Sequence, residues 1–161
     1  MPLKPTDVQG TKAYLVATTV ATGTATEIKA AINGGKQITC LLEVGDIKLG
    51  TRGTTEYSCI DQDSAYKSLG SISLASITPQ LLFDAADTAG QQDLINMWDN
   101  NTRRKLILAL NDQITPTTGN PTFIQFEAAV SSPSIGIAKN SAVMYNPTIE
   151  ICTKPVLTKA S

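Results

Sequence analysis

Short stretches in which apolar and polar residues alternate recur along this chain and predict a protein built mainly of β-strands. The clearest stretch is 123–130 (FIQFEAAV), where alternate residues from Ile124 to Val130 share one face. Further strands are expected at 13–19, 37–44, 54–60, 71–77, 103–110 and 142–153, with Pro147 bending the last of them. About seven short strands predict an antiparallel β-sandwich or partly closed barrel.

One segment has a helical period and predicts a helix that flanks the sheet. Leu94, Ile95 and Trp98 lie near one face of a helix over 91–98. Trp98 is the single tryptophan of the chain. We expect these three side chains to anchor the helix on the sheet, because a large aromatic ring contributes much buried area.

The start of this helix has two candidate caps. Asp87 or Thr88 can accept hydrogen bonds from the first turn, and Thr88 with Gln91 fits a capping box. A second segment, 27–32 (EIKAAI), fits a short helix or a strand equally well, because six mixed residues match either period.

Three segments lack a core pattern within what we interpret as a single domain over 1–161. Residues 1–12 are expected to form an extended arm, since they include two prolines and a glycine. Residues 154–161 are expected to form a tail. Residues 45–70 contain four glycines and predict a long loop or a projecting hairpin. Segments of this length in compact domains are usually functional or disordered.

Composition excludes several classes of function. The 161 residues carry 13 Lys+Arg, 14 Asp+Glu and no His, for a net charge of −1. Proteins that wrap nucleic acid need a clustered basic surface, which this balance does not supply. The absence of His excludes triads that use a histidine base within this chain. Only 17% of the residues are charged, which suits a surface that is covered by other copies of the chain.

Cysteine usage and motifs give no sign of catalysis, metal or cofactor. Cys40, Cys59 and Cys152 are scattered, and we expect buried free thiols rather than a zinc site. The Asp61–Gln62–Asp63 stretch lacks the other ligands of a calcium loop. We therefore expect a protein that is not an enzyme and holds no cofactor. No apolar run approaches the ~20 residues that cross a bilayer, so no membrane location is expected.

A series of motifs between residues 41 and 156 gives a family resemblance. In order, they are LLEVGDIKLG, EYSCID, SAYKSLG, ISLASI, DTAGQQDLINMW, RRKLILAL, FIQFEAAVSSPSIG and a final Thr-Lys-Pro. Each motif is weak alone, but their order and spacing resemble the tail tube proteins of long-tailed, non-contractile phages of the lambda type. The turn region 110–121 is less compact than the usual family turn.

The resemblance implies a structural virion protein. Such proteins form rings, here expected to be hexameric, that stack into a hollow tube for ejection of the genome. The implied partners are further copies of the chain and the tape-measure, tail-tip and tail-terminator proteins. Double-stranded DNA is expected as a transient, non-specific passenger. Assembly is expected in the host cytoplasm, and the final location is the phage tail.

The same resemblance assigns residues to assembly. The segment 45–70 is the expected contact between subunits or rings, through Asp46, Arg52, Glu56, Tyr57, Asp61, Asp63 and Tyr66. A basic wall would bind DNA and stall it, so the lumen is expected to be acidic or neutral. Glu127 and Glu150 lie on the polar faces of their strands and are candidates to line the lumen; exposure on the outside of the tube is the alternative.

Two other functions fit the pattern. One is the inner tube of a contractile or type VI-like injection machine, which would share the fold and could carry protein. The other is a capsid-decoration or adhesin module, which would stay a discrete oligomer at any concentration.

Overall fold

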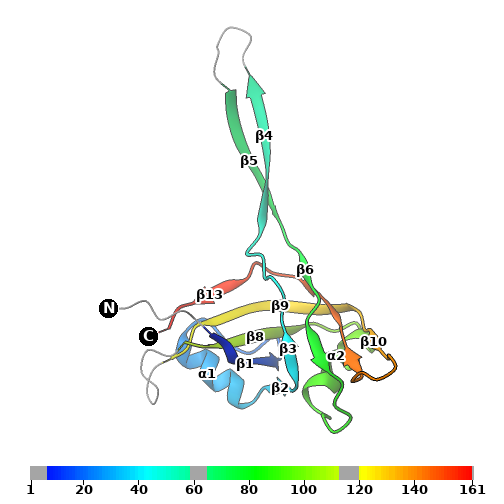
Figure 1. Ribbon diagram of the computed structural model, residues 1–161. Coiled ribbons are helices and arrows are strands. Elements are labelled where there is room, and N and C mark those ends of the chain that lie inside the picture. The colour runs from blue at the N-terminus through cyan, green and yellow to red at the C-terminus, as the bar shows by residue number, and fades with distance from the viewer. Residues whose placement is uncertain (1–6, 59–64, 113–119, 161) are drawn as a thin grey trace.

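The computed structural model describes residues 7–58, 65–112 and 120–160 and confirms a mainly β protein with antiparallel sheets (Figure 1). The described residues contain two helices, whereas the sequence pattern predicted a helix over 91–98 and left 27–32 open between helix and strand. The described chain forms two stacked sheets and a separate hairpin that stands out from them.

The larger sheet, called sheet A here, runs in the order β2-β1-β8-β9-β12-β6, and β13 also pairs with β9. Its strands are β1 (Asp7–Val16), β2 (Lys36–Ile38), β6 (Ser76–Ile77), β8 (Arg104–Asn111), β9 (Phe123–Ser132), β12 (Thr148–Ile151) and β13 (Val156–Thr158). The central strands pair with Leu106 opposite Phe126, so both apolar rows face the same side.

The smaller sheet, sheet B, runs in the order β10-β11-β7-β3. Its strands are β3 (Leu41–Glu43), β7 (Gln80–Leu82), β10 (Ile135–Gly136) and β11 (Met144–Tyr145). The remaining strands, β4 (Thr51–Ser58) and β5 (Ala65–Ser73), pair only with each other among the described residues. Residues 45–70 therefore contain most of a hairpin, one of the two forms expected from the sequence.

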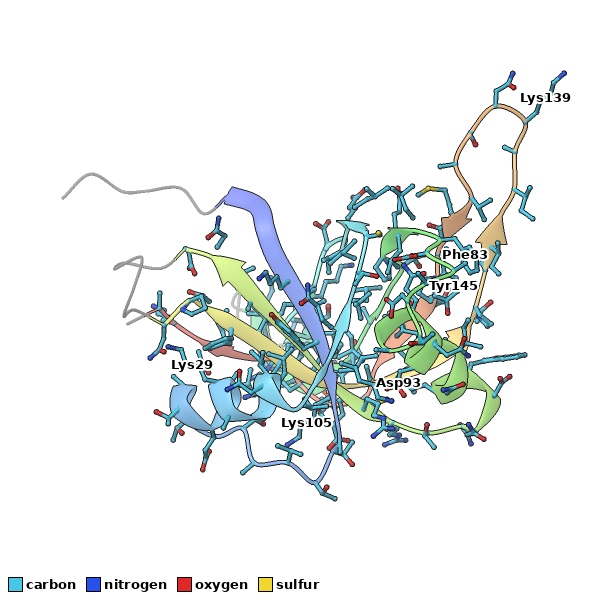
Figure 2. All side chains as sticks on the ribbon, turned by 90° about the horizontal axis from the view of Figure 1, so that it is seen from below. Lys29, Phe83, Asp93, Lys105, Lys139 and Tyr145 are labelled. Atoms are coloured by element: carbon cyan, nitrogen blue, oxygen red, sulfur yellow. The ribbon has the colours of Figure 1, made fainter. Side chains whose placement is uncertain are left out.

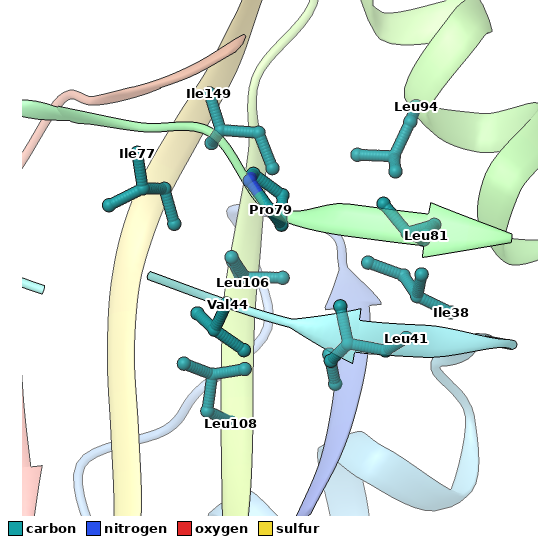
Figure 3. Close-up of a pocket in the computed structure, with 11 residues that line it drawn as sticks. Ile38, Leu41, Val44, Ile77, Pro79, Leu81, Leu94, Leu106, Leu108 and Ile149 are labelled. Carbon is teal, nitrogen blue, oxygen red and sulfur yellow. The ribbon is translucent and has the colours of Figure 1, made fainter. Parts of the chain in front are cut away.

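The main core lies between the two sheets (Figure 3). Leu106, Leu108 and Ile149 come from sheet A, and Leu81 and Leu41 come from sheet B. The cavity left where these side chains meet is about 10 Å³. Small-molecule sites are typically ≈ 300–1,000 Å³, so this part of the interior is packing and not a ligand pocket.

The other face of sheet A is covered at one end by α1 (Ala25–Asn33). A second apolar cluster forms there, in which Ile28 packs with Ile107 and Phe123. The helix begins at a capping box, since the Thr24 side chain accepts from the Glu27 amide while the Glu27 carboxylate accepts from the Thr24 amide. This box decides between helix and strand for 27–32.

The expected strand over 37–44 is two strands in different sheets. The chain turns at Cys40, whose φ of 55° lies in the left-handed region and ends the extended conformation. Cys40 is consequently exposed, so the prediction of a buried thiol there is wrong. Cys152 is half-buried, and Cys59 lies outside the described residues. The stretch 142–153 also divides, into β11 and β12, on either side of the buried Pro147.

Both ends of the described chain pair with sheet A. Residues 7–12, expected in an arm, belong to β1, which lies against β8. Residues 156–158, expected in a tail, form β13 beside the first half of β9, with Leu157 opposite Ile124. These two segments have little strand pattern of their own, and they become strands because a strand distant in sequence supplies the backbone hydrogen bonds.

Candidate assembly surfaces

The hairpin of β4 and β5 extends away from the body of the protein (Figure 1). Every residue of β4 is exposed. Its register places the acidic Glu56 opposite the basic Lys67, a cross-strand pair of opposite charge that favours this alignment, and Tyr57 opposite Tyr66. A two-stranded hairpin is marginal in water on its own, and both of its outer edges present unpaired backbone groups. The hairpin therefore has the features of a surface that is completed by a partner.

The residues expected to make subunit contacts are distributed over this region. Arg52, Glu56 and Tyr57 lie on β4, Tyr66 lies on β5, Asp46 lies before the hairpin, and Asp61 and Asp63 lie outside the described residues. The Arg52 guanidinium is used within the hairpin, where Nη1 donates to the Gly70 carbonyl oxygen at 3.3 Å. Tyr57 is 60% exposed, which leaves its ring free to contact another surface.

Helix α2 (Gly90–Asp99) is anchored differently from the sequence prediction. Leu94 is fully buried and Ile95 is partly buried against the core, as expected. Trp98 is 47% exposed, so its predicted role as the anchor is wrong, and Met97 occupies the buried position.

Gln91 acts as a buried polar link between α2 and sheet B. Its side-chain Nε2 donates to the carbonyl oxygens of Leu82 at 2.8 Å and Thr39 at 3.1 Å, and its Oε1 accepts from the Asp84 amide at 3.0 Å. All three partners are backbone groups. Buried polar groups that are satisfied in this way fix one arrangement of the elements that they join.

Asp87 caps α2, and the Thr88–Gln91 box does not form. The Asp87 carboxylate accepts from the amides of Ala89, Gly90 and Gln91 at 2.8–3.1 Å and from the Thr39 hydroxyl at 2.7 Å. Burial on its own raises the pKa of Asp87, but these hydrogen bonds outweigh burial and hold the pKa below its ordinary value. Asp87 thus stays ionised, which also suits the positive end of the helix.

A buried carboxylate joins three elements. Asp93 of α2 contacts the Lys36 ammonium of β2 at 2.7 Å and the Arg104 guanidinium of β8 at 3.4 Å, and its side chain is 4% exposed. Removing one partner from such a group leaves a buried charge without compensation, which is costly. Asp93 therefore holds α2 in register with sheet A.

Glu127 and Glu150 lie on the face of sheet A that points away from sheet B. Glu127 is half-buried on β9 opposite Lys105, and Glu150 is exposed on β12 opposite Ala129. Ser131 donates to the Glu150 carboxylate at 2.9 Å, while the Lys105 ammonium is turned to the Val20 carbonyl oxygen at 2.6 Å. The two carboxylates therefore lie on the same side of sheet A, each on the face of its strand that is opposite the apolar core row.

Comparison with known proteins gives a match at the level of structure alone. No protein-family model matches the chain, and no curated protein sequence does either. The structure is similar to the SPP1 tail tube, with a TM-score of 0.66 and 14% identity over 96% of this chain and 80% of that chain.

Two further matches come from an extracellular contractile injection system named PVC. Its sheath/tube terminator structure has a TM-score of 0.69 and 13% identity over 98% of this chain and 99% of that chain. Its extended sheath-tube complex has a TM-score of 0.65 and 14% identity over 96% and 92%. The chain has a tail tube fold. The matched proteins are named as parts of tubes and of injection machines, not as enzymes.

Two exposed surfaces of this tail tube fold were not predicted from the sequence. The first is an exposed apolar row near the β10–β11 loop, formed by Phe83, Ile137 and Val143. The second is a groove at the other end of sheet A, lined by apolar residues and by Glu43 and Asp46. The exposed Ile and Val within an otherwise polar loop are the only sequence signal for the first surface. The groove has no such signal, because segments distant in sequence form it.

Within the described residues of this tail tube fold, no group of three His, Cys, Asp or Glu side chains is placed to hold a metal ion. None of its described helices is long and apolar enough to cross a membrane. Burial raises the pKa of Tyr145 to about 12, so this ring stays neutral inside the core.

Proposed function

We propose that this chain is the structural subunit of a tail tube, in which rings of subunits stack into a hollow conduit. The observation that carries the proposal is the uncovered hairpin β4–β5 on a body whose fold matches tube proteins over nearly its whole length. An isolated two-stranded hairpin is only marginally stable in water, so contact with a neighbouring copy would stabilise it. The role is mechanical, so no catalytic group is required.

The finer proposal is a hexameric ring in the tail of a non-contractile phage. A head-to-tail contact that closes gives a ring, and a contact that does not close gives a filament. A wide barrel built from many strands leaves an aqueous channel. In this proposal, DNA passes through the channel, tape-measure, tail-tip and tail-terminator proteins bind the ends, and subunits assemble in the host cytoplasm before they become part of the virion.

Negative-stain electron microscopy of the concentrated protein tests the proposal. We expect hollow tubes of uniform width, together with rings at lower concentration. Discrete particles of fixed size at every concentration, including after addition of a tail-tip complex, would contradict a tube and favour the decoration or adhesin function.

A second candidate is the inner tube of a contractile injection machine. The structural similarity to the PVC tube components favours it as directly as the SPP1 match favours the phage tail. The two differ in the passenger and in whether a sheath surrounds the tube. Isolation of native particles would separate them, because an enclosing sheath assigns the chain to a contractile machine.

We further propose that Glu127 and Glu150 face the lumen. Their shared polar surface on sheet A is the basis, and a negative wall would repel the DNA phosphates and keep the passenger mobile. Glu127→Lys with Glu150→Lys is expected to leave tubes intact and to slow DNA ejection from particles. The control also adds positive charge, but at exposed positions of the two helices, as Asp99→Lys with Ala30→Lys. Ejection at the wild-type rate by the first variant would place both carboxylates outside the lumen.

A further inference from the structure

The inward face of sheet B continues beyond the body as an exposed apolar row. Leu81 and Tyr145 pair across β7 and β11 and are buried in the core. Two residues further along each strand, Phe83 and Val143 point to the same side, because side chains alternate along a strand. The Phe83 amide donates to the Val143 carbonyl oxygen at 2.9 Å, so the pairing extends to these positions.

Ile137 extends the row onto the third strand. It lies two residues beyond Ile135, which pairs with Tyr145. Phe83 is 41% exposed, Val143 is 37% exposed, and Ile137 is 81% exposed. Ile137 is the most exposed of the large apolar residues among those described. Figure 2 shows Phe83 beside Tyr145 at the base of a loop that projects from the body, with Lys139 at its tip.

A groove of about 420 Å³ lies at the opposite end of the same side of sheet A. Its walls are apolar and include Leu42, Val44, Leu108, Leu110 and Ile124. Leu42 is 52% exposed, so the groove is open to solvent in the monomer. Two exposed carboxylates, those of Glu43 and Asp46, stand at the groove.

The charges of the loop and the groove are complementary. Lys139 is the only charged residue between Ser131 and Asn146. The groove contributes two acidic residues and no basic one. Opposite charges placed around an apolar contact fix its register and disfavour the wrong partner.

The two surfaces of one copy cannot reach each other. Ile124, the second residue of β9, lies at the groove, and Ser132 ends β9 before the loop. Eight residues of strand separate them by about 26 Å, at ≈ 3.3 Å per residue. A contact between different patches on two identical subunits is head-to-tail, and it generates a ring when the rotation closes.

We propose that the β10–β11 loop of one copy inserts Ile137 into the groove of the next copy, with Lys139 beside Glu43 and Asp46. This inference rests on the proposed tube function and identifies a contact within its ring. The row of Phe83, Val143 and Ile137 then passes from solvent to an apolar wall, which covers the most exposed large apolar side chain among the described residues.

Charge exchange tests the contact with the full chain. Lys139→Glu is expected to raise the concentration needed for assembly by roughly tenfold, because each interface then holds only acidic groups. Glu43→Lys with Asp46→Lys is expected to do the same. The chain that carries all three substitutions is expected to assemble within about threefold of the wild type. Sedimentation velocity and electron microscopy measure assembly, and thermal unfolding by circular dichroism confirms that each exposed-site variant is folded.

Lys29→Glu on α1 is the matched control for this charge reversal, because Lys29 lies away from Lys139 (Figure 2) and is not among the residues that line the groove. Two results would overturn the proposal while leaving the tube function in place: wild-type assembly by Lys139→Glu, or failure of the triple variant to recover. A wild-type chain that remains monomeric at every concentration would overturn the tube function and this contact together.

Discussion

A chain in which residues 52–72 are replaced by Asn-Gly is expected to fold as a monomer and to form no tubes. Thr51 and Ser73 are paired in register, so a two-residue turn can join them without disturbing the body. The removed strand β4 is exposed throughout and contributes nothing to either apolar cluster. Its loss should change the thermal midpoint by less than about 2 °C, while electron microscopy should show no tubes.

The matched control is the variant Thr54→Ser with Thr55→Ser, which keeps the hairpin and removes only two methyl groups from its surface. This control is expected to assemble normally. Tubes of normal width from the shortened chain would show that stacking does not depend on the hairpin. A shortened chain that fails to fold would instead assign the hairpin a role in the stability of the subunit.

Gly90→Ala is expected to destabilise the subunit by roughly 3 kcal/mol, the upper part of the range for overpacking. A Cβ at this position would meet the backbone of β2, with the Gln37 carbonyl oxygen at 2.1 Å and the Ile38 Cα at 2.6 Å. Backbone atoms cannot move aside as a flexible side chain can, so α2 must shift away from sheet A. The expected loss is about 6–12 °C in the thermal midpoint, measured by calorimetry.

Gly53→Ala is the matched control, since a Cβ there meets no atom within 4 Å. We expect its midpoint to differ from that of the wild type by no more than about 2 °C. If Gly90→Ala were as stable as this control, the close approach of α2 to β2 would not be a constraint on the fold. Loss of assembly by Gly90→Ala at temperatures where it is fully folded would further show that the position of α2 matters for ring contacts.

The elements that could be predicted from sequence are those whose pattern is local. The alternation in 123–130 and the basic-apolar stretch 103–110 correspond to β9 and β8, the two central strands of sheet A. The helix α2 and its buried Leu94 were also predicted. In each case the residues that set the structure are neighbours in the chain, and burial on one face enforces the period.

The features that were not predicted depend on contacts between distant segments. Trp98 is exposed and Met97 is buried, which the helical period of α2 alone did not reveal. The buried Gln91 side chain binds the backbone of Thr39 and Leu82, and these contacts have no local sequence signal. The break at Cys40 sends β2 and β3 to different sheets, and no local signal marks it. The capping box of Thr24 and Glu27 was present in the sequence and would have identified α1.

The candidate site shows the same division. Strand alternation placed Glu127 and Glu150 each on the polar face of its own strand, but whether the two strands present that face to the same side depends on the pairing between β9 and β12. The groove beside Glu43 could not be predicted, since β1, β3, β8 and β9 form it only after the sheets have stacked. The exposed row that ends at Ile137 is defined by pairing among three short strands that have little pattern of their own.

The separation of the hairpin from the two apolar clusters has an evolutionary consequence. Substitutions on β4 should change the free energy of unfolding very little, because no β4 residue belongs to either apolar cluster. The sequence of β4 is therefore constrained mainly by the surface of the neighbouring subunit that it contacts. Substitutions in the body are instead limited by packing, as at Gly90. If the hairpin is exchanged between two divergent subunits, each chimera should bind the partner of the hairpin's donor. The fold and stability of the body should stay unchanged.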